Sequence, residues 1–190
     1  MRNLHDHLAT YAAYHRDRRN IATHFVGIPM IVAGVFTFMA RPAVELESYP
    51  ALGLSPALGL FGFAVAFYLL LDLRFGTAMA AFTAPALWLG TWLSGESTGF
   101  WLGAASILFV GGWVIQFIGH AFEGKKPAFV DDLVGLLIGP LFLVAEAAFA
   151  MGLRRELCEG IEAKVGPTYI RRSGEAAAAA PSLAPASSPS

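Results

Sequence analysis

Three histidines lie where long apolar segments of the chain begin or end. His15 and His24 stand at the start of one apolar run, and His120 follows the end of another. Neutral imidazoles with nearby carboxylates bind iron, zinc or copper, and an open-sided set of histidines and carboxylates is typical of oxygen-activating non-haem Fe(II). A thiolate cage is excluded, because Cys158 is the single cysteine of the chain. The residue types therefore indicate a metal site and leave the metal open.

The spacing around His120 predicts a polar face at the end of a helix. Trp113, Gln116, His120 and Glu123 recur at intervals of three, four and three residues, so they share one helix face. Such a stripe is costly in lipid and normally faces protein, a cavity or a ligand. A carboxylate close to a histidine can ligate the same metal or orient a neighbouring imidazole. The alternative is an interfacial tryptophan beside a capped helix end.

His15 and His24 cannot face one site from a single straight helix. They are nine residues apart, which at about 100° per residue puts them on opposite faces. We expect a break near Asn20, because an asparagine side chain can cap the following helix. An amphipathic surface helix over residues 4–19 would then fold back and turn His15 toward His24. The alternative is that each histidine is simply packed beneath this helix. The predicted apolar stripe consists of Leu4, Leu8, Tyr11 and His15.

The elements that position these side chains are predicted to be membrane helices. The chain has 190 residues, of which 56% are hydrophobic and 14% charged, against roughly half and a quarter in soluble domains. Four uncharged runs approach the roughly 17 to 25 residues that a membrane helix needs. A backbone in lipid must satisfy its own hydrogen bonds, so each run is expected to be helical. The predicted fold is therefore an all-α integral membrane protein with four transmembrane helices, over Phe25–Ala40, Leu52–Leu71, Phe75–Leu93 and Phe100–Ile118.

A fifth apolar segment, Leu133–Leu153, is predicted to re-enter the membrane rather than to cross it. If it crosses, the Lys and Arg residues divide 7 to 6 between the two sides; if it returns, they divide 12 to 1, with Arg41 alone opposite. The positive-inside rule expects such a bias. This arrangement places all five histidines on the basic, cytoplasmic side. A fifth span remains the alternative.

Two further carboxylates have open roles. Asp72 lies at the end of the second apolar run. It either belongs to the site, or it forms an ion pair with Arg74 or caps the loop. Glu146 lies on the fifth segment and is either a ligand or proton acceptor, or a protonated, hydrogen-bonded contact between helices. His5 and His7 are expected to be solvated residues before the first helix.

The chain is predicted to form one helical membrane domain over residues 1–172, followed by a tail. Residues 173–190 are rich in Ala, Pro and Ser and are expected to be disordered. No nucleic-acid motif is recognised, so nucleic acid is not an expected partner. A small transporter would require polar groups in the middle and far half of several spans, and only Glu146 has such a place. A non-catalytic metal-binding scaffold remains an alternative to an enzyme.

Several ordered blocks of the sequence resemble the 2-hydroxy fatty acid dioxygenase family. They are "YAAYH", Asn20, His24 with the following Gly-Ile-Pro, "WVIQFIGHAFE", "KPA", "DDL" and "GPLFLVAE", and they cover roughly residues 8–150. The resemblance implies an Fe(II)-dependent membrane enzyme that uses O2 to shorten a 2-hydroxy fatty acid by one carbon, a step of alpha-oxidation. A bacterial inner membrane, with the site on its cytoplasmic face, is the expected location.

The resemblance also implies a set of site residues. The histidine pattern of the family falls on His15, His24 and His120, which become the expected iron ligands. Arg16, Arg18 or Arg19 could attract the substrate carboxylate. His5 and His7 belong to none of the matching blocks. Further matching positions, expected to serve catalysis, are Asn20, Asp72, Gln116, Glu123 and Glu146.

Overall fold

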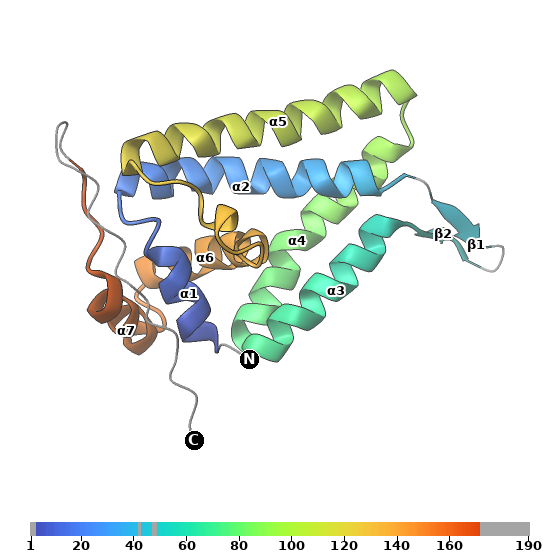
Figure 1. Ribbon diagram of the computed structural model, residues 1–190. Helices are drawn as coiled ribbons and strands as arrows, with labels where there is room; N and C mark the ends of the chain where they lie inside the picture. Colours follow the sequence, from blue (N-terminus) through green and yellow to red (C-terminus); the bar gives the residue numbers. More distant parts are fainter. Residues whose placement is uncertain (1–2, 42, 47–48, 172–190) are drawn as a thin grey trace.

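The computed structural model describes residues 3–41, 43–46 and 49–171 and is mainly helical (Figure 1). The long helices α2 and α5 lie antiparallel and side by side, and α3 and α4 form a second pair. Shorter helices gather at the end where α2 begins and α5 ends. The predicted tail over residues 173–190 lies outside the described residues. In chain order the elements are α1 (Leu4–Ala12), α2 (Arg18–Met39), β1 (Val44–Leu46), β2 (Tyr49–Leu54), α3 (Pro56–Leu71), α4 (Leu73–Ser94), α5 (Thr98–Glu123), η1 (Ala128–Val130), α6 (Gly135–Ala150) and α7 (Arg155–Val165).

The prediction of a mainly helical chain with apolar candidate membrane spans is confirmed, but the count of four spans is not. Within the described residues, α2 and α5 are long and apolar enough to cross a membrane. The pair formed by α6 and α7, bent by 114°, raises the count to three if it acts as one span. The third helix has 16 residues, slightly fewer than a perpendicular span needs. Pro85 and several polar or small residues lower the hydropathy of α4.

The predicted second span begins too early. Residues of β2 pair with β1 as a short antiparallel hairpin, and helix α3 starts only at Pro56. The Ser55 side chain accepts a hydrogen bond from the Leu58 amide and caps this helix, and proline fits the first helical position because its φ is already helical. The apolar residues before Ser55 therefore continue the hydrophobic pattern without continuing the helix.

The predicted break near Asn20 is also misplaced. Helix α1 ends at Ala12, a loop covers residues 13–17, and α2 begins at Arg18. Asp17 caps α2 by accepting a hydrogen bond from the Arg19 amide at 2.9 Å. Asn20 already lies inside the first turn of α2. The amphipathic helix is thus shorter than the predicted 4–19, although the fold-back that it was expected to make is present.

Glycines allow α2 and α5 to approach closely. A Cβ atom on Gly27 would lie 2.9 Å from the carbonyl oxygen of Gly112, and one on Gly112 would lie 2.7 Å from that of Gly27. A side chain at either position would therefore push the two backbones apart. The outer face of α5 instead presents large apolar side chains, as a lipid-facing helix does. These exposed residues are Phe100, Leu102, Ile107, Val110, Val114, Phe117 and Ile118.

The fifth apolar segment leaves and rejoins the same end of the α2–α5 pair. Following α7, the chain comes back to the start of α2, where the Arg18 amide donates to the Tyr169 carbonyl at 2.8 Å. The Tyr169 amide donates in turn to the Arg16 carbonyl at 2.9 Å. At the other end of the segment, Asp131 accepts a hydrogen bond from Tyr14, in the loop before α2. The bend of 114° between α6 and α7 fits either a broken span or a re-entrant hairpin, so the predicted re-entry stays a prediction.

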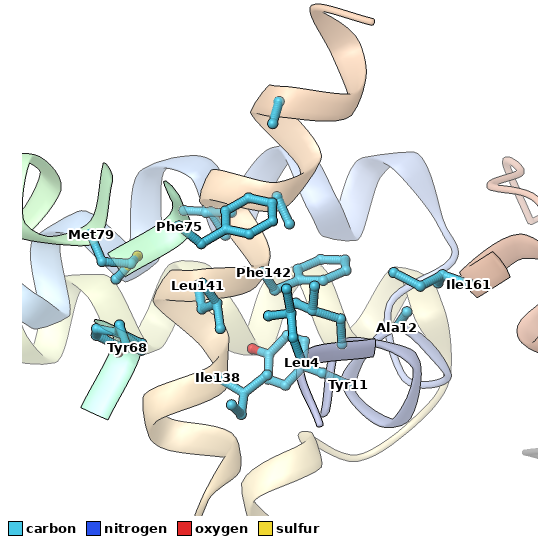
Figure 2. Packing of buried hydrophobic residues seen from close by; sticks show 14 of the residues in the cluster. Leu4, Tyr11, Ala12, Tyr68, Phe75, Met79, Ile138, Leu141, Phe142 and Ile161 are labelled. Atoms are coloured by element: carbon cyan, nitrogen blue, oxygen red, sulfur yellow. The ribbon is translucent and has the colours of Figure 1, made fainter. Parts of the chain in front are cut away.

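The main hydrophobic core holds α6 against its neighbours (Figure 2). Leu141 and Phe142 of α6 lie between Tyr11 of α1 and the side chains of α3 and α4, Phe75 and Met79 among them. Phe142 is buried and packs on both Tyr11 and His15, with ring centroids 5.1 and 5.6 Å apart. The core therefore reaches directly to His15, which lies in the loop before α2 and not on the predicted helix.

Candidate metal centre

His15, His24 and His120 meet in one buried cluster. His15 comes from the loop before α2, His24 from the second turn of α2, and His120 from the last turn of α5. The His15 ring centroid lies 4.6 Å from that of His24 and 5.0 Å from that of His120, and the last two are 5.1 Å apart. Each residue offers one ligand atom within 4.8 Å of the others. The predicted juxtaposition of the three rings is present.

Backbone carbonyls fix the orientation of two of the rings. His15 Nδ1 donates to the carbonyl of Tyr11, and His24 Nδ1 donates to the carbonyl of Asn20, each at 2.8 Å. A carbonyl only accepts, so both rings carry their proton on Nδ1. This leaves the Nε2 atom of each neutral ring with a free lone pair. Hydrogen bonds of this kind orient the histidine ligands of metal sites.

The resulting donor set fits a metal ion. The Nε2 atoms of His15 and His24 lie 3.0 Å apart, and two lone pairs at this distance repel unless a cation or a proton lies between them. His120 Nδ1 is buried and has no hydrogen-bond partner among the described residues. Such an unpartnered polar atom is costly unless a ligand satisfies it. The three rings thus offer nitrogen ligands to a transition metal such as iron, zinc or copper.

His15 is kept in the neutral form that metal binding requires. It is fully buried. Burial lowers the pKa of His15 well below its ordinary value, and the nearby His24 and His120 rings lower it further, against a smaller opposing effect of the Tyr11 carbonyl. The Tyr11 ring also stacks on His15, with centroids 4.2 Å apart and planes inclined by 5°.

Glu123 organises the loop that carries His15. Its buried carboxylate accepts hydrogen bonds from the backbone amides of Arg16 and Asp17 and from the side-chain amide of Asn20, at 2.8 to 3.1 Å. Glu123 therefore ties the end of α5 to the start of α2, one turn beyond His120. Asn20 adds a second connection, because its backbone carbonyl holds His24. Glu123 thus contacts the loop that carries His15, and Asn20 contacts the His24 ring.

Gln116 borders a cavity beside the histidines. The cavity has a volume of about 70 Å³ and is lined by Gln116, His24 and His120 together with apolar side chains. The Oε1 atom of Gln116 is buried, and no described residue donates a hydrogen bond to it. The predicted polar stripe of α5 is therefore present, with Trp113 also in the cavity wall. Among the described residues that line this space, Gln116 Oε1 and His120 Nδ1 are buried without a hydrogen-bond partner.

Glu146 is connected to the loop of His15 by a contact with Arg16. The Arg16 guanidinium is buried, donates to the carbonyls of Ala12, His15 and Gly166, and lies 3.5 Å from Glu146. Glu146 is thus half of an ion pair between α6 and the loop of His15. Arg16 is held by four acceptors, whereas Arg18 and Arg19 contact the returning chain at Thr168 and Arg171.

Asp72 lies in a different contact network from the histidines. Its carboxylate caps α4 through the amides of Arg74 and Phe75 and forms an ion pair with Arg154 at 2.8 Å. The predicted cap is therefore present, whereas the ion pair forms with Arg154 at the start of α7 and not with Arg74. His5 and His7 lie within α1 and are partly buried, so the prediction of solvated residues before the first helix is wrong. His5 lies apart from the cluster, with its Nδ1 atom 3.2 Å from Lys164 Nζ. His7 lines a small cavity beside Tyr14 and Asp131.

Tyr11 and Arg16 are two site residues whose position the sequence pattern did not reveal. Tyr11 was predicted only as part of an apolar stripe, although its place four residues before His15 allows both the ring stacking and the carbonyl contact. It also lines the histidine cavity. The burial of Arg16 depends on Gly166, which is 150 residues away in the chain, so no local signal could have found it.

Comparison with known proteins decides the family. Residues 1–151 match the family model described as 2-hydroxy-palmitic acid dioxygenase Mpo1-like. The chain belongs to this family. The 2-hydroxy-palmitic acid dioxygenase MPO1 of Saccharomyces cerevisiae is 28% identical over 162 residues, which make up 84% of this chain and 88% of the yeast protein. No solved structure matches the chain.

Membership of the Mpo1-like family confirms the resemblance inferred from the sequence blocks. The matched region contains the three histidines and extends beyond Glu146. It ends inside the bend between α6 and α7. The helix α7 and the returning residues 166–171, which contact Arg16, Arg18 and Arg19, therefore lie outside the match.

Proposed function

We propose that this protein is an Fe(II)-dependent dioxygenase that uses O2 to shorten 2-hydroxy fatty acids by one carbon. The observation that carries the proposal is the buried cluster of His15, His24 and His120, whose free nitrogen lone pairs converge in a chain of the Mpo1-like family. The yeast relative is named for action on 2-hydroxy-palmitic acid. The same cluster would serve a non-catalytic metal-binding scaffold, so activity must be tested separately from metal binding.

The three histidines would hold the metal through neutral imidazoles. When bound, Fe(II) supplies coordination of the oxygen atoms of a 2-hydroxy acid together with redox chemistry toward O2. The cluster consists of three histidines, and no carboxylate of the described residues belongs to it. Three ligands would leave further coordination positions of the metal open for the substrate.

Gln116 is proposed to orient the substrate. Its unpartnered Oε1 atom borders the same cavity as His24 and His120, and an amide oxygen accepts a hydrogen bond from a hydroxyl. The 2-hydroxyl group of the substrate supplies such a donor. The apolar remainder of the wall excludes water, which strengthens polar contacts inside the cavity.

Glu123 and Asn20 are proposed to act through the histidines rather than on the substrate. Glu123 fixes the loop of His15, and the carbonyl of Asn20 fixes the ring of His24. Asp72 and Glu146 remain proposed site residues that lack contact with the three rings in this structure. Their ion pairs with Arg154 and Arg16 support roles in holding α6 and α7 in place.

The proposed site lies at one face of a membrane. Its histidines occupy the end of the α2–α5 pair where the arginines of residues 16–19 meet the returning chain. This clustering supports the cytoplasmic face under the positive-inside rule. The relative comes from yeast and gives no reason to prefer a bacterial inner membrane.

Turnover by the purified protein tests the proposal. The full chain in lipid nanodiscs is loaded with Fe(II) and given 2-hydroxypalmitic acid with and without O2. The expected result is formation of a product one carbon shorter, with consumption of O2, only in the aerobic sample. Metal binding without oxygen-dependent turnover would favour the scaffold, and transport of a solute without chain shortening would favour a small transporter.

A further inference from the structure

A second cavity adjoins the histidine cavity. Its volume is about 370 Å³, within the roughly 300–1,000 Å³ of typical small-molecule sites. Five residues line both spaces: Ile31, Val32, Trp113, Leu136 and Pro140. The two cavities therefore share one wall, formed by α2, α5 and α6.

The second cavity presents an apolar surface although it contains two hydroxyl groups. Tyr68 donates its hydroxyl to the carbonyl of Leu137 at 2.7 Å, and Thr83 donates to that of Met79 at 2.8 Å. Both hydroxyl protons are thus engaged with the backbone. The rest of the lining is hydrophobic and includes Phe36, Leu60, Ala64 and Phe109.

The two cavities together form a space that is polar at one end and apolar at the other. Unsatisfied polar atoms of Gln116 and His120 border the small cavity, while the lining of the large one is mostly apolar and its two hydroxyls are already engaged. A molecule with a compact polar head and a long hydrocarbon tail matches this polarity. Burial of each methylene of such a tail is favourable.

We propose that the second cavity takes the hydrocarbon chain of the 2-hydroxy acid and that Ala64 limits the length of chain accepted. This inference rests on the proposed function, which supplies the head group at the histidines. Ala64 is buried, lines the second cavity and is absent from the wall of the first. A larger side chain at this position would fill the tail space without touching the histidines.

Ala66 on the same helix provides a matched control. Its side chain is exposed on α3, whereas that of Ala64 is buried. Ala64→Leu and Ala66→Leu therefore add the same atoms to one helix, once into the cavity and once on its outer surface. Cavity filling commonly stabilises a protein, and the added atoms of Ala64→Leu enter the second cavity, so its melting temperature is expected to equal or exceed that of the wild type.

Anaerobic binding is the primary measurement. The Fe(II)-loaded proteins in nanodiscs are titrated with 2-hydroxy acids from octanoic to octadecanoic acid, with O2 excluded. Ala64→Leu is expected to weaken binding of the longest acid by about tenfold or more. This is the lower end of the discrimination that one extra methylene produces in a hydrophobic pocket. The shortest acid should bind as in the wild type, and Ala66→Leu should leave the whole profile unchanged.

Aerobic turnover of the same series separates this inference from the proposed function. If the wild type binds the acids but shortens none of them, the proposed function fails and the chain-length profile still decides the inference. An unchanged profile in Ala64→Leu, or an equal loss for every chain length, would overturn it. Loss of a co-purifying membrane lipid from Ala64→Leu, with binding of the acids unaltered, would also overturn it, because the cavity would then hold lipid.

Discussion

His15 Nε2 and His24 Nε2 lie 3.0 Å apart although neither nitrogen carries a proton in the tautomers that their backbone contacts require. The contact brings a loop residue against a helix residue nine positions later. It is unfavourable by itself, because two acceptors face each other. A metal ion shared by the two rings and His120 would convert this repulsion into coordination.

Alanine at any one of the three histidines is expected to abolish both iron retention and activity. Ligands of one ion act as a unit, so the double variants should be hardly worse than the single ones, whereas independent packing residues would show additive losses. Iron per protein, measured after gel filtration, checks the first part. A chelator should likewise remove activity from the wild type, and added Fe(II) should restore it.

His5→Ala is the matched control for the histidine variants. His5 contacts Lys164 at the surface of α7 and lies outside the cluster. The variant should keep its iron and its turnover. Loss of iron from His5→Ala together with retention in His15→Ala would show that the ligand set has been assigned wrongly.

Glu123→Gln is expected to weaken iron binding through the loop of His15. The carboxylate accepts from three donors, and an amide in its place turns one N–H group toward another donor. A buried hydrogen-bonding group left without a partner costs about 1–3 kcal/mol. We expect a lower melting temperature and a lower affinity for Fe(II), the second measured by titration of the folded protein.

Glu159→Gln, on the exposed face of α7, is the corresponding control and should match the wild type. The affinity for Fe(II) distinguishes positioning from general support of the fold. If Glu123→Gln melts earlier but binds Fe(II) with unchanged affinity, Glu123 stabilises the helix ends without orienting His15.

Gly119→Ala is expected to destabilise the protein and to disturb the histidines. A Cβ atom here would lie 2.5 Å from Asn20 Oδ1 and would also collide with the Thr23 hydroxyl. Overpacking of this kind costs typically about 1–3 kcal/mol, and the residue adjoins His120. The melting temperature and the iron content should both fall.

Gly103→Ala on the same helix should have the opposite effect on stability. No described atom lies within 4 Å of a Cβ atom at Gly103, and alanine is favoured over glycine in a helix by up to about 1 kcal/mol. Equal melting temperatures for the two variants would contradict the close α2–α5 contact. The close approach of α2 and α5 is made at Gly27, Gly112 and Gly119.

The histidine cluster could be predicted because helical periodicity and family pattern agree. Gln116, His120 and Glu123 fall on one face by spacing alone, and the structure buries all three. The position of the helix break could not be found in the same way. Asp17 and Asn20 are both residue types that cap helices, so the local sequence does not show which of them begins α2. In the structure the Asn20 side chain instead donates a hydrogen bond to Glu123 across the α2–α5 interface.

Charged side chains were the least predictable part of the site. Nothing in the neighbouring sequence distinguishes Arg16 from an arginine on the surface. Its guanidinium is nevertheless buried and donates to backbone carbonyls, among them that of Gly166. Glu146 and Asp72 likewise find arginines far away in the chain. Long-range polar contacts of this kind leave no periodic trace, whereas apolar helix faces do.

Asp72→Asn is expected to loosen the bend between α6 and α7 and to leave the histidine cluster intact. The Asp72–Arg154 ion pair joins the start of α4 to the start of α7, where Arg154 has a positive φ of 53°. Asparagine keeps the capping oxygen but removes the charge. The variant should melt earlier at neutral pH and retain its iron. A double-mutant cycle with Arg154→Gln should show coupling between the two residues.

The pH dependence of melting identifies the Asp72 carboxylate as the source of this stabilisation. Burial opposes ionisation of Asp72, but the hydrogen bonds from Arg154 and the Phe75 and Arg74 amides outweigh it, so the pKa of the carboxyl is lowered in the folded protein. Its contribution is therefore present above the ordinary carboxyl pKa of about 4 and is lost as the pH falls through the lower folded value. The difference in melting temperature between wild type and Asp72→Asn should shrink in that acidic range. A difference that stays constant down to the lowest pH would exclude the ionised carboxylate as its source. Loss of turnover at full iron content and full folding would favour a catalytic role for Asp72.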